Sequence, residues 1–317
     1  GIRDYKVTGV QTCALPILLT TKTGFIGEAI NRAGITVSKR DAILRDVASE
    51  IEWSKVIGIA PDEYVRSAED YARMVRISIT KVESRDIARI YEAYESLKRQ
   101  ERAIDFEDVL LLTVGMLEEE RDIRDRVRDQ YRYFTVDEYQ DVSPLQQRLL
   151  DLWLGKREDI CVVGDPAQTI YSFAGATPAF LLNFTNKYAH AEVIRLSTAY
   201  RSTPEIVNMA NTILRKSDLG HALDPINDHG EKPMVSGYSS EKEEIQSITE
   251  SIKAEIGTGV DPSTIAILAR TNAQLESFEA ALSSSGIENQ IRSSEDRKST
   301  RLNSSHLVIS YAVFCLK

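Results

Sequence analysis

The spacing of apolar residues divides the chain into a helical part and a part in which short apolar runs alternate with helices. From residue 18 to about residue 100, apolar side chains recur every three or four positions, which is the period of a helix with one buried face. Pro61 opens one of these stretches and suits the first turn of a helix. The pattern predicts an α-helical block over residues 18–103, with little sign of β-strands.

The pattern changes after this block. It predicts a helix over residues 106–118, a charged helix, a compact strand over residues 133–136 and a short helix over residues 145–154. Two further apolar runs, residues 159–165 and 191–198, are typical of strands. Strands that alternate with helices indicate an α/β fold with an open, mostly parallel sheet.

The last third of the chain predicts a second α/β unit. Ser202, followed three residues later by Glu205, indicates a capping box at the start of a helix. The segments that follow alternate between strand and helix, over residues 232–240, 241–259, 263–270 and 272–287.

Composition narrows the class of protein. No apolar run reaches the roughly 20 residues needed to span a bilayer, and no basic start with an apolar core marks a secretory signal. The three cysteines, Cys13, Cys161 and Cys315, lie far apart, which excludes a disulfide framework and fits a reducing, cytoplasmic location. The net charge of −9 counts against a simple DNA-coating protein, so DNA would need a local basic or aromatic groove.

The two ends do not continue the patterns of their neighbours. Residues 1–17 and 296–317 resemble in-frame translations of the oligonucleotide adapters that are ligated to DNA for sequencing, each with a gap of index length. We therefore expect both segments to be artefactual and leave them out of the fold prediction. The expected genuine segment is residues 18–295.

Carboxylates follow two of the predicted strands. Asp137 and Glu138 come directly after the run at residues 133–136, and Asp165 ends the run at residues 159–165. In parallel α/β sheets, ligands bind outside the carboxyl ends of the strands. Asp137 there suits Mg²⁺, usually held through water, and Glu138 can take a proton from an attacking water. An ordinary acidic turn after a strand would give the same pattern.

Two neighbouring stretches add candidate ligand groups. Gln168 follows the second strand and can sense a γ-phosphate, while Tyr171 and Phe173 can stack on single-stranded bases at about 1–3 kcal/mol each. Tyr200 offers a flat face for a purine, and Arg201 offers a fixed cation for phosphate charge just before a helix N-terminus. Core packing of the two loop aromatics and a solvated surface arginine are the simpler alternatives.

Three motifs resemble a known family. "VDEYQD", "VVGDPAQTIYSFAGA" and "LSTAYRST", in this order and at this spacing, resemble the central motifs of the UvrD/Rep/PcrA-like superfamily 1 DNA helicases, as do "IDFEDVLL" and "IAILARTNAQLESFEAAL". The resemblance covers most of residues 18–291. It implies an ATP-dependent 3′–5′ helicase that uses ATP and Mg²⁺ to move on single-stranded DNA and to separate strands at duplex junctions, in DNA repair or replication.

The resemblance also implies an architecture. The family has RecA-like parallel-sheet motor domains of the P-loop NTPase type. Residues 18–103 would be an α-helical subdomain inserted in the first motor domain, residues 104–195 part of that domain, and residues 196–295 the start of the second.

Where the motifs match, the resemblance implies roles for individual residues. On the nucleotide side, Asp137 would bind Mg²⁺ and Glu138 would activate water. Gln168 and Arg201 would contact the γ-phosphate, and Tyr200 would stack on adenine.

On the DNA side, the resemblance implies that Tyr171 and Phe173 contact bases. Phe173 stands where the family commonly has tryptophan, and Ala174 stands where it often has arginine. Stacking should survive the first change, whereas a polar contact at Ala174 is in doubt.

The sequence contains no GxxxxGK[ST] run, the loop that grips the β- and γ-phosphates. In the family this loop lies upstream of the helical subdomain, so we expect the chain by itself to hydrolyse ATP negligibly. Two alternatives stay open: the motor part of a helicase–nuclease, and a non-catalytic α/β module that binds DNA.

Overall fold

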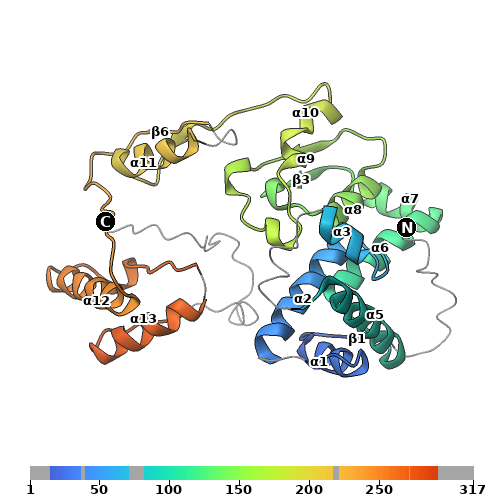
Figure 1. Ribbon diagram of the computed structural model, residues 1–317. Coiled ribbons are helices and arrows are strands. Elements are labelled where there is room, and N and C mark those ends of the chain that lie inside the picture. The colour runs from blue at the N-terminus through green and yellow to red at the C-terminus, as the bar shows by residue number, and fades with distance from the viewer. Residues whose placement is uncertain (1–14, 37–39, 71–81, 217–220, 271, 292–317) are drawn as a thin grey trace. The chain divides into compact units, whose positions relative to one another are not determined.

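The computed structural model describes residues 15–36, 40–70, 82–216, 221–270 and 272–291 (Figure 1). The predicted artefactual ends therefore lie outside the described residues, apart from residues 15–17. The chain divides between Val193 and Ile194 into two compact units, which are described separately. None of the described helices is long and apolar enough to cross a membrane.

The first unit begins with a helical core. Its helices are α1 (Thr23–Arg32), α2 (Arg40–Ile57), α3 (Tyr64–Asp70) and α5 (Ser84–Glu101). α1 packs against α2 and α5, and all three lie together in Figure 1. Their apolar faces supply fully buried side chains such as Ile26, Ile51 and Ile90. The helical pattern predicted for this block is confirmed in the described residues.

A short ladder in this unit was not predicted. β1 (Ile17–Leu18) pairs in parallel with β2 (Ala103–Ile104), and hydrogen bonds run from Ile17 N to Arg102 O and from Leu19 N to Ile104 O, at 2.9 and 2.8 Å. Two residues per strand are too few to show the two-residue period by which a strand is predicted.

The α/β part of the first unit follows the prediction closely. Its elements are α6 (Phe106–Glu119), α7 (Arg121–Gln130), β3 (Phe134–Val136), α8 (Pro144–Leu154) and β4 (Ile160–Val162). β3 and β4 are parallel neighbours in register, with Phe134 opposite Ile160 and Val136 opposite Val162. α6 and α8 pack together through Leu117, Leu145 and other apolar residues. The two strands therefore end at the same edge.

Arg157 connects the ends of two helices through hydrogen bonds to backbone carbonyl oxygens. The Arg157 guanidinium donates to the carbonyl oxygens of Tyr131, Trp153 and Leu154, at 3.0, 2.8 and 3.0 Å, and to two more carbonyls at 3.1 and 3.4 Å. The last carbonyls of a helix have no partner within it, and a cation near them is favourable. Arg157 thus joins the C-terminal ends of α7 and α8 just before β3 and β4.

The second unit contains helices and one short parallel ladder. Its main elements are β5 (Thr198–Ala199), α11 (Pro204–Leu214), β6 (Asp224–Pro225), α12 (Glu241–Gly257) and α13 (Asn272–Ser284). β5 pairs with β6, and α12 packs on α13 through Ile248, Ile252, Phe278 and Leu282. The described structure is thus an α/β arrangement rich in helices, with short parallel ladders.

Two local predictions for the second unit are wrong. Of the strands predicted over residues 191–198, 232–240 and 263–270, only Thr198 belongs to a ladder. The apolar alternation is present, but a strand also needs hydrogen bonds to a neighbour. The predicted capping box of Ser202 and Glu205 is wrong as well. Thr203 is the N-cap of α11, and Glu205 accepts hydrogen bonds from His229 and Gly230 instead.

Candidate functional site

The carboxyl ends of β3 and β4 bring two of the predicted motifs together. Val163 N–H donates to Val136 O at 2.8 Å, and Tyr139 N–H donates to Val163 O at 2.9 Å. The chain that leaves β3 therefore crosses the end of β4. These backbone hydrogen bonds place Asp137 and Glu138 beside the turn at Asp165.

A sharp turn sets the position of Glu138. Its backbone is left-handed, with φ 51° and ψ 41°, and the short 3₁₀ helix Tyr139–Asp141 starts directly after it. The Asp137 carboxylate accepts the Glu138 N–H at 2.9 Å. Tyr139 is buried and donates its hydroxyl to Gln147 at 2.6 Å. Burial raises the pKa of Tyr139 to about 12, so this anchor of the turn stays neutral at physiological pH.

Gln140 connects the two strand ends, although the sequence did not single it out. The side chain is 1% exposed. Its Nε2 donates to Glu138 Oε2 at 2.7 Å, and its Oε1 accepts the Asp165 N–H at 3.0 Å. The only sequence signal was its place inside "VDEYQD", since the contact to Asp165 spans 25 positions.

The Asp165 turn brings in Gln168. One Asp165 oxygen accepts the Ala167 N–H at 2.9 Å, and the other accepts Gln168 Nε2 at 3.0 Å. A continuous chain of hydrogen bonds therefore runs from Glu138 through Gln140 and Asp165 to Gln168. The structure brings Asp137, Glu138 and Gln168 together at one edge of the β3–β4 ladder.

Asp141 ties the same turn to the loop that follows β4. The Ile170 N–H donates to its carboxylate, and its Oδ1 is buried with no hydrogen-bond partner. Burial, and then the nearby charge of Glu138, raise the pKa of Asp141. The charged form of Asp141 is therefore disfavoured at this position.

The predicted DNA-contacting aromatics lie on that loop. The rings of Tyr171 and Phe173 are 6.1 Å apart and tilted by 50°. Tyr171 O accepts the N–H groups of Ala174 and Ala176, which closes the loop on itself. Phe173 is 49% exposed, so it is not a core side chain, whereas Tyr171 is half-buried. The loop presents an aromatic pair within a few residues of Gln168.

Tyr200 and Arg201 belong to the second unit. Tyr200 is 72% exposed, and Arg201 is also exposed. Asn227 Nδ2 donates to the carbonyl oxygens of Tyr200 and Ser202, at 2.9 and 3.3 Å, and so braces the backbone on both sides of Arg201. The predicted grouping of Arg201 with Asp137 and Gln168 spans the two units and stays a prediction.

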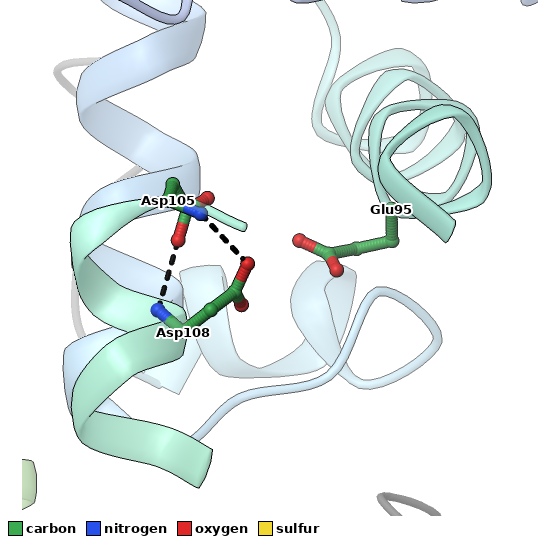
Figure 2. Close-up of side chains that lie close together, drawn as sticks. All are labelled: Glu95, Asp105 and Asp108. Atoms are coloured by element: carbon green, nitrogen blue, oxygen red, sulfur yellow. Dashed lines mark hydrogen bonds between the residues drawn. The ribbon is translucent and has the colours of Figure 1, made fainter. Parts of the chain in front are cut away.

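A buried acidic cluster in the first unit was missed by the sequence analysis (Figure 2). Glu95 of α5 faces Asp105 and Asp108 at the start of α6, close enough to share an ion. Two lysines already meet them: Lys55 Nζ lies 2.7 and 2.8 Å from the Asp105 oxygens, and Lys98 Nζ lies 2.9 Å from Glu95 and 3.0 Å from Asp105.

The two ammonium groups supply the positive charge that a metal ion would bring, so the cluster does not fit a metal site. It is a buried ion-pair network that joins α2, α5 and α6. Magnesium fits better at Asp137, which is exposed at the strand end, because this ion keeps several of its waters and needs one or two carboxylates.

Comparisons with known proteins agree with the division into two units. Residues 31–189 match the family described as UvrD/REP helicase N-terminal domain, and residues 194–296 match the UvrD-like helicase C-terminal domain. The second match begins at Ile194, which is also the first residue of the second unit.

Three curated relatives illustrate the similarity. ATP-dependent DNA helicase UvrD2 of Mycobacterium tuberculosis is 40% identical over 286 residues, which cover 88% of this chain and 40% of the relative. Putative ATP-dependent DNA helicase YjcD of Bacillus subtilis is 31% identical, with coverages of 64% and 27%. ATP-dependent DNA helicase PcrA of Staphylococcus aureus is 32% identical, with coverages of 63% and 28%. The chain thus spans 40% or less of the length of these relatives.

Proposed function

Because the chain belongs to the UvrD/REP helicase family, we propose that it supplies part of the motor of an ATP-dependent DNA helicase that moves 3′ to 5′ along single-stranded DNA. Residues 104–195 form part of the first RecA-like motor domain, residues 18–103 its inserted helical subdomain, and residues 196–295 the start of the second motor domain. The relatives' names, all ATP-dependent DNA helicases, support this proposal.

One observation carries the proposal. The hydrogen-bonded chain from Glu138 to Gln168 lies at the carboxyl ends of two parallel strands, where ligands bind in such sheets. Asp141 fastens the same turn to the loop of Tyr171 and Phe173. Candidate groups for nucleotide chemistry and for DNA contact are therefore connected within a single unit.

The proposed division of labour follows from residue chemistry. Glu138 accepts a proton from the attacking water, and Asp137 would hold Mg²⁺. The ion, when bound, neutralises charge on the β- and γ-phosphates. Gln168 hydrogen-bonds the γ-phosphate, and Arg201 and Tyr200 contribute a cation and a stacking face from the second unit.

DNA binding by the loop gives the first test. We expect Phe173→Ala to weaken binding of a fluorescein-labelled oligothymidylate by about 5- to 150-fold, since one stacked base is worth about 1–3 kcal/mol. Fluorescence anisotropy measures the affinity. Tyr133→Ala is the matched control, because Tyr133 is a strongly exposed aromatic of the same unit outside the loop. Equal effects of the two changes would refute a specific loop contact.

Nucleotide gives the second part of the test. A motor couples its two ligands, so a non-hydrolysable ATP analogue with Mg²⁺ should change the affinity for the oligonucleotide. An oligonucleotide affinity that responds to nucleotide would support the motor assignment over a non-catalytic DNA-binding module. Because the sequence has no GxxxxGK[ST] run, we expect negligible ATP turnover by the chain itself. DNA-stimulated turnover that Glu138→Gln abolishes would contradict that expectation.

A further inference from the structure

We propose that Gln140 is a positioning residue, which holds the Glu138 carboxylate in place and couples its position to the Asp165–Gln168 turn. The inference rests on the proposed function for the roles of Glu138 and Gln168. The contacts that carry it are independent of that function.

Gln140 makes one bond to each strand end and has almost no contact with water. Its Nε2–H donates to Glu138 Oε2 at 2.7 Å, and its Oε1 accepts the Asp165 N–H at 3.0 Å. The side chain is 1% exposed. A buried amide bonded at both ends cannot turn without breaking both bonds, so any shift of Glu138 is felt at Asp165.

The chemistry of the site favours glutamine here. The position must donate to a carboxylate and accept from a backbone N–H at the same time, and among side chains of this length only a neutral amide does both. Four carboxylates lie in the same stretch of structure, namely those of Asp137, Glu138, Asp141 and Asp165. An ionised glutamate at position 140 would add repulsion to a site that is already acidic.

The backbone opposite Gln140 is shaped to admit it. A Cβ on Gly164 would lie 2.6 Å from Gln140 Oε1 and 3.2 Å from Gln140 N. A side chain at position 164 would therefore force the Gln140 amide to shift from its present position. Gly164 therefore allows the amide to approach the Asp165 N–H, and the two residues act as one fitted pair.

The connection reaches beyond the two strand ends. The Asp165 carboxylate accepts Gln168 Nε2 at 3.0 Å. Movement of the Asp165 backbone therefore shifts the side chain that is proposed to contact the γ-phosphate. A displacement of the Glu138 carboxylate would reach Gln168 through Gln140 without any large movement of the strands.

A double-mutant cycle in the chain tests this inference. Glu138→Gln removes the charge, and Gln140→Leu removes the bridge. The readout is the rate of hydrogen exchange at the Asp165 backbone amide, followed by NMR. We expect Glu138→Gln to change this rate by about two- to tenfold in the native background, the range of one hydrogen bond, and to leave it unchanged in the Gln140→Leu background.

Two further variants keep the test decisive. Gln147→Leu is the matched control: Gln147 is another buried glutamine with bonds at both ends, to Tyr139 and to Asp151, but it does not join Glu138 to Asp165. It should leave the effect of Glu138→Gln intact. If Gln140→Leu does not fold, Gln140→Met keeps the length of the side chain, adds no charge and removes both bonds, and the same loss of coupling is expected.

Three results would overturn the inference: an equal effect of Glu138→Gln with and without Gln140, no effect in either background, or loss of the effect in Gln147→Leu. None of these measurements uses nucleotide or DNA. If the proposed helicase function is refuted, the double-mutant cycle can therefore still be interpreted. If the cycle shows no coupling through Gln140, the proposed helicase function is not affected.

Discussion

Replacement of Lys55 by methionine should destabilise the first unit by about 3–5 kcal/mol, the usual cost of removing one partner from a buried ion-pair network. The Lys55 side chain is fully buried and reaches both oxygens of Asp105 and one of Asp108. Methionine keeps the length of the apolar stem. The cluster would be left with three carboxylates and only Lys98, so its formal charge changes from −1 to −2.

Urea unfolding of the chain measures this loss. Trp53 is buried two residues before Lys55, so its fluorescence reports on the same helix. Lys187→Met is the matched control, because Lys187 pairs with Asp151 at 2.5 Å on the surface, where both side chains are nearly half exposed. An exposed pair of this kind contributes about 0–1 kcal/mol. Equal losses in the two variants would refute the view that burial makes the Lys55 network strong.

The effect of Lys55→Met should also depend on pH. Burial lowers the pKa of Lys55, but Glu95, Asp105 and Asp108 outweigh burial and raise this pKa well above its usual value. Its stabilising contribution is therefore present below about pH 10 and is lost as the pH rises through the folded-state pKa.

The pKa of Asp105 is shifted in the opposite direction from that of Lys55. Burial alone raises the pKa of this carboxyl, but Lys55 and Lys98 outweigh burial and hold it well below the usual range. Its contribution is present above about pH 4 and is lost as the pH falls through the folded-state pKa. The cost of Lys55→Met should therefore be greatest between about pH 4 and pH 10. A cost that stays constant across that range and beyond would contradict the assignment.

Two further changes test other contacts. Arg157→Met removes the guanidinium that donates to the carbonyls at the ends of α7 and α8, so we expect thermal unfolding to show a loss of stability of about 2–4 kcal/mol. Arg121→Met, the control, removes an exposed arginine of α7 and should change stability by under about 0.5 kcal/mol. Asp141→Asn should leave the chain as stable or more stable at neutral pH, because burial and then Glu138 raise the pKa of this carboxyl and the charged form is disfavoured in the folded state. The gain should vanish below about pH 4, where the native carboxyl is protonated in both states, and a destabilised variant at pH 7 would contradict this reasoning.

The elements that could be predicted from sequence are those that carry their own signal. The runs around β3 and β4 are apolar, short and followed by polar turn residues, so both strands were placed to within a few residues. α8 begins with a capping box of Ser143 and Gln146 around Pro144, which is a purely local feature.

The remaining elements depend on partners that the local sequence does not reveal. The predicted strand at residues 232–240 has the right alternation, yet Met234 and Val235 are more than three-quarters exposed, and no ladder forms there among the described residues. Ser202 offered a plausible cap, but Glu205 is held by a loop 24 and 25 positions away. Local pattern gives the potential for a strand or a cap, and tertiary contacts decide whether it is used.

The candidate site shows the same limit. Asp137 and Glu138 directly follow β3 and Gln168 lies in the turn after β4, so their common position at one strand edge could be predicted, while their roles stay predictions. Gln140 could not, because its role comes from a contact with a backbone N–H on another strand. The Lys55 network was also out of reach, since its partners lie 40 to 53 positions from Lys55 along the chain.

The backbone at Glu138 has a consequence of its own. Among the described residues, only Arg102 and Glu138 are non-glycine residues with a positive φ. Such a conformation costs an L-amino acid about 1–2 kcal/mol, and glycine would relieve most of it. Selection for a sturdier fold alone would favour glycine at position 138 and so erase the carboxylate. Under the proposed function, stability favours glycine at this position of the turn after β3, whereas the activation of water requires the carboxylate.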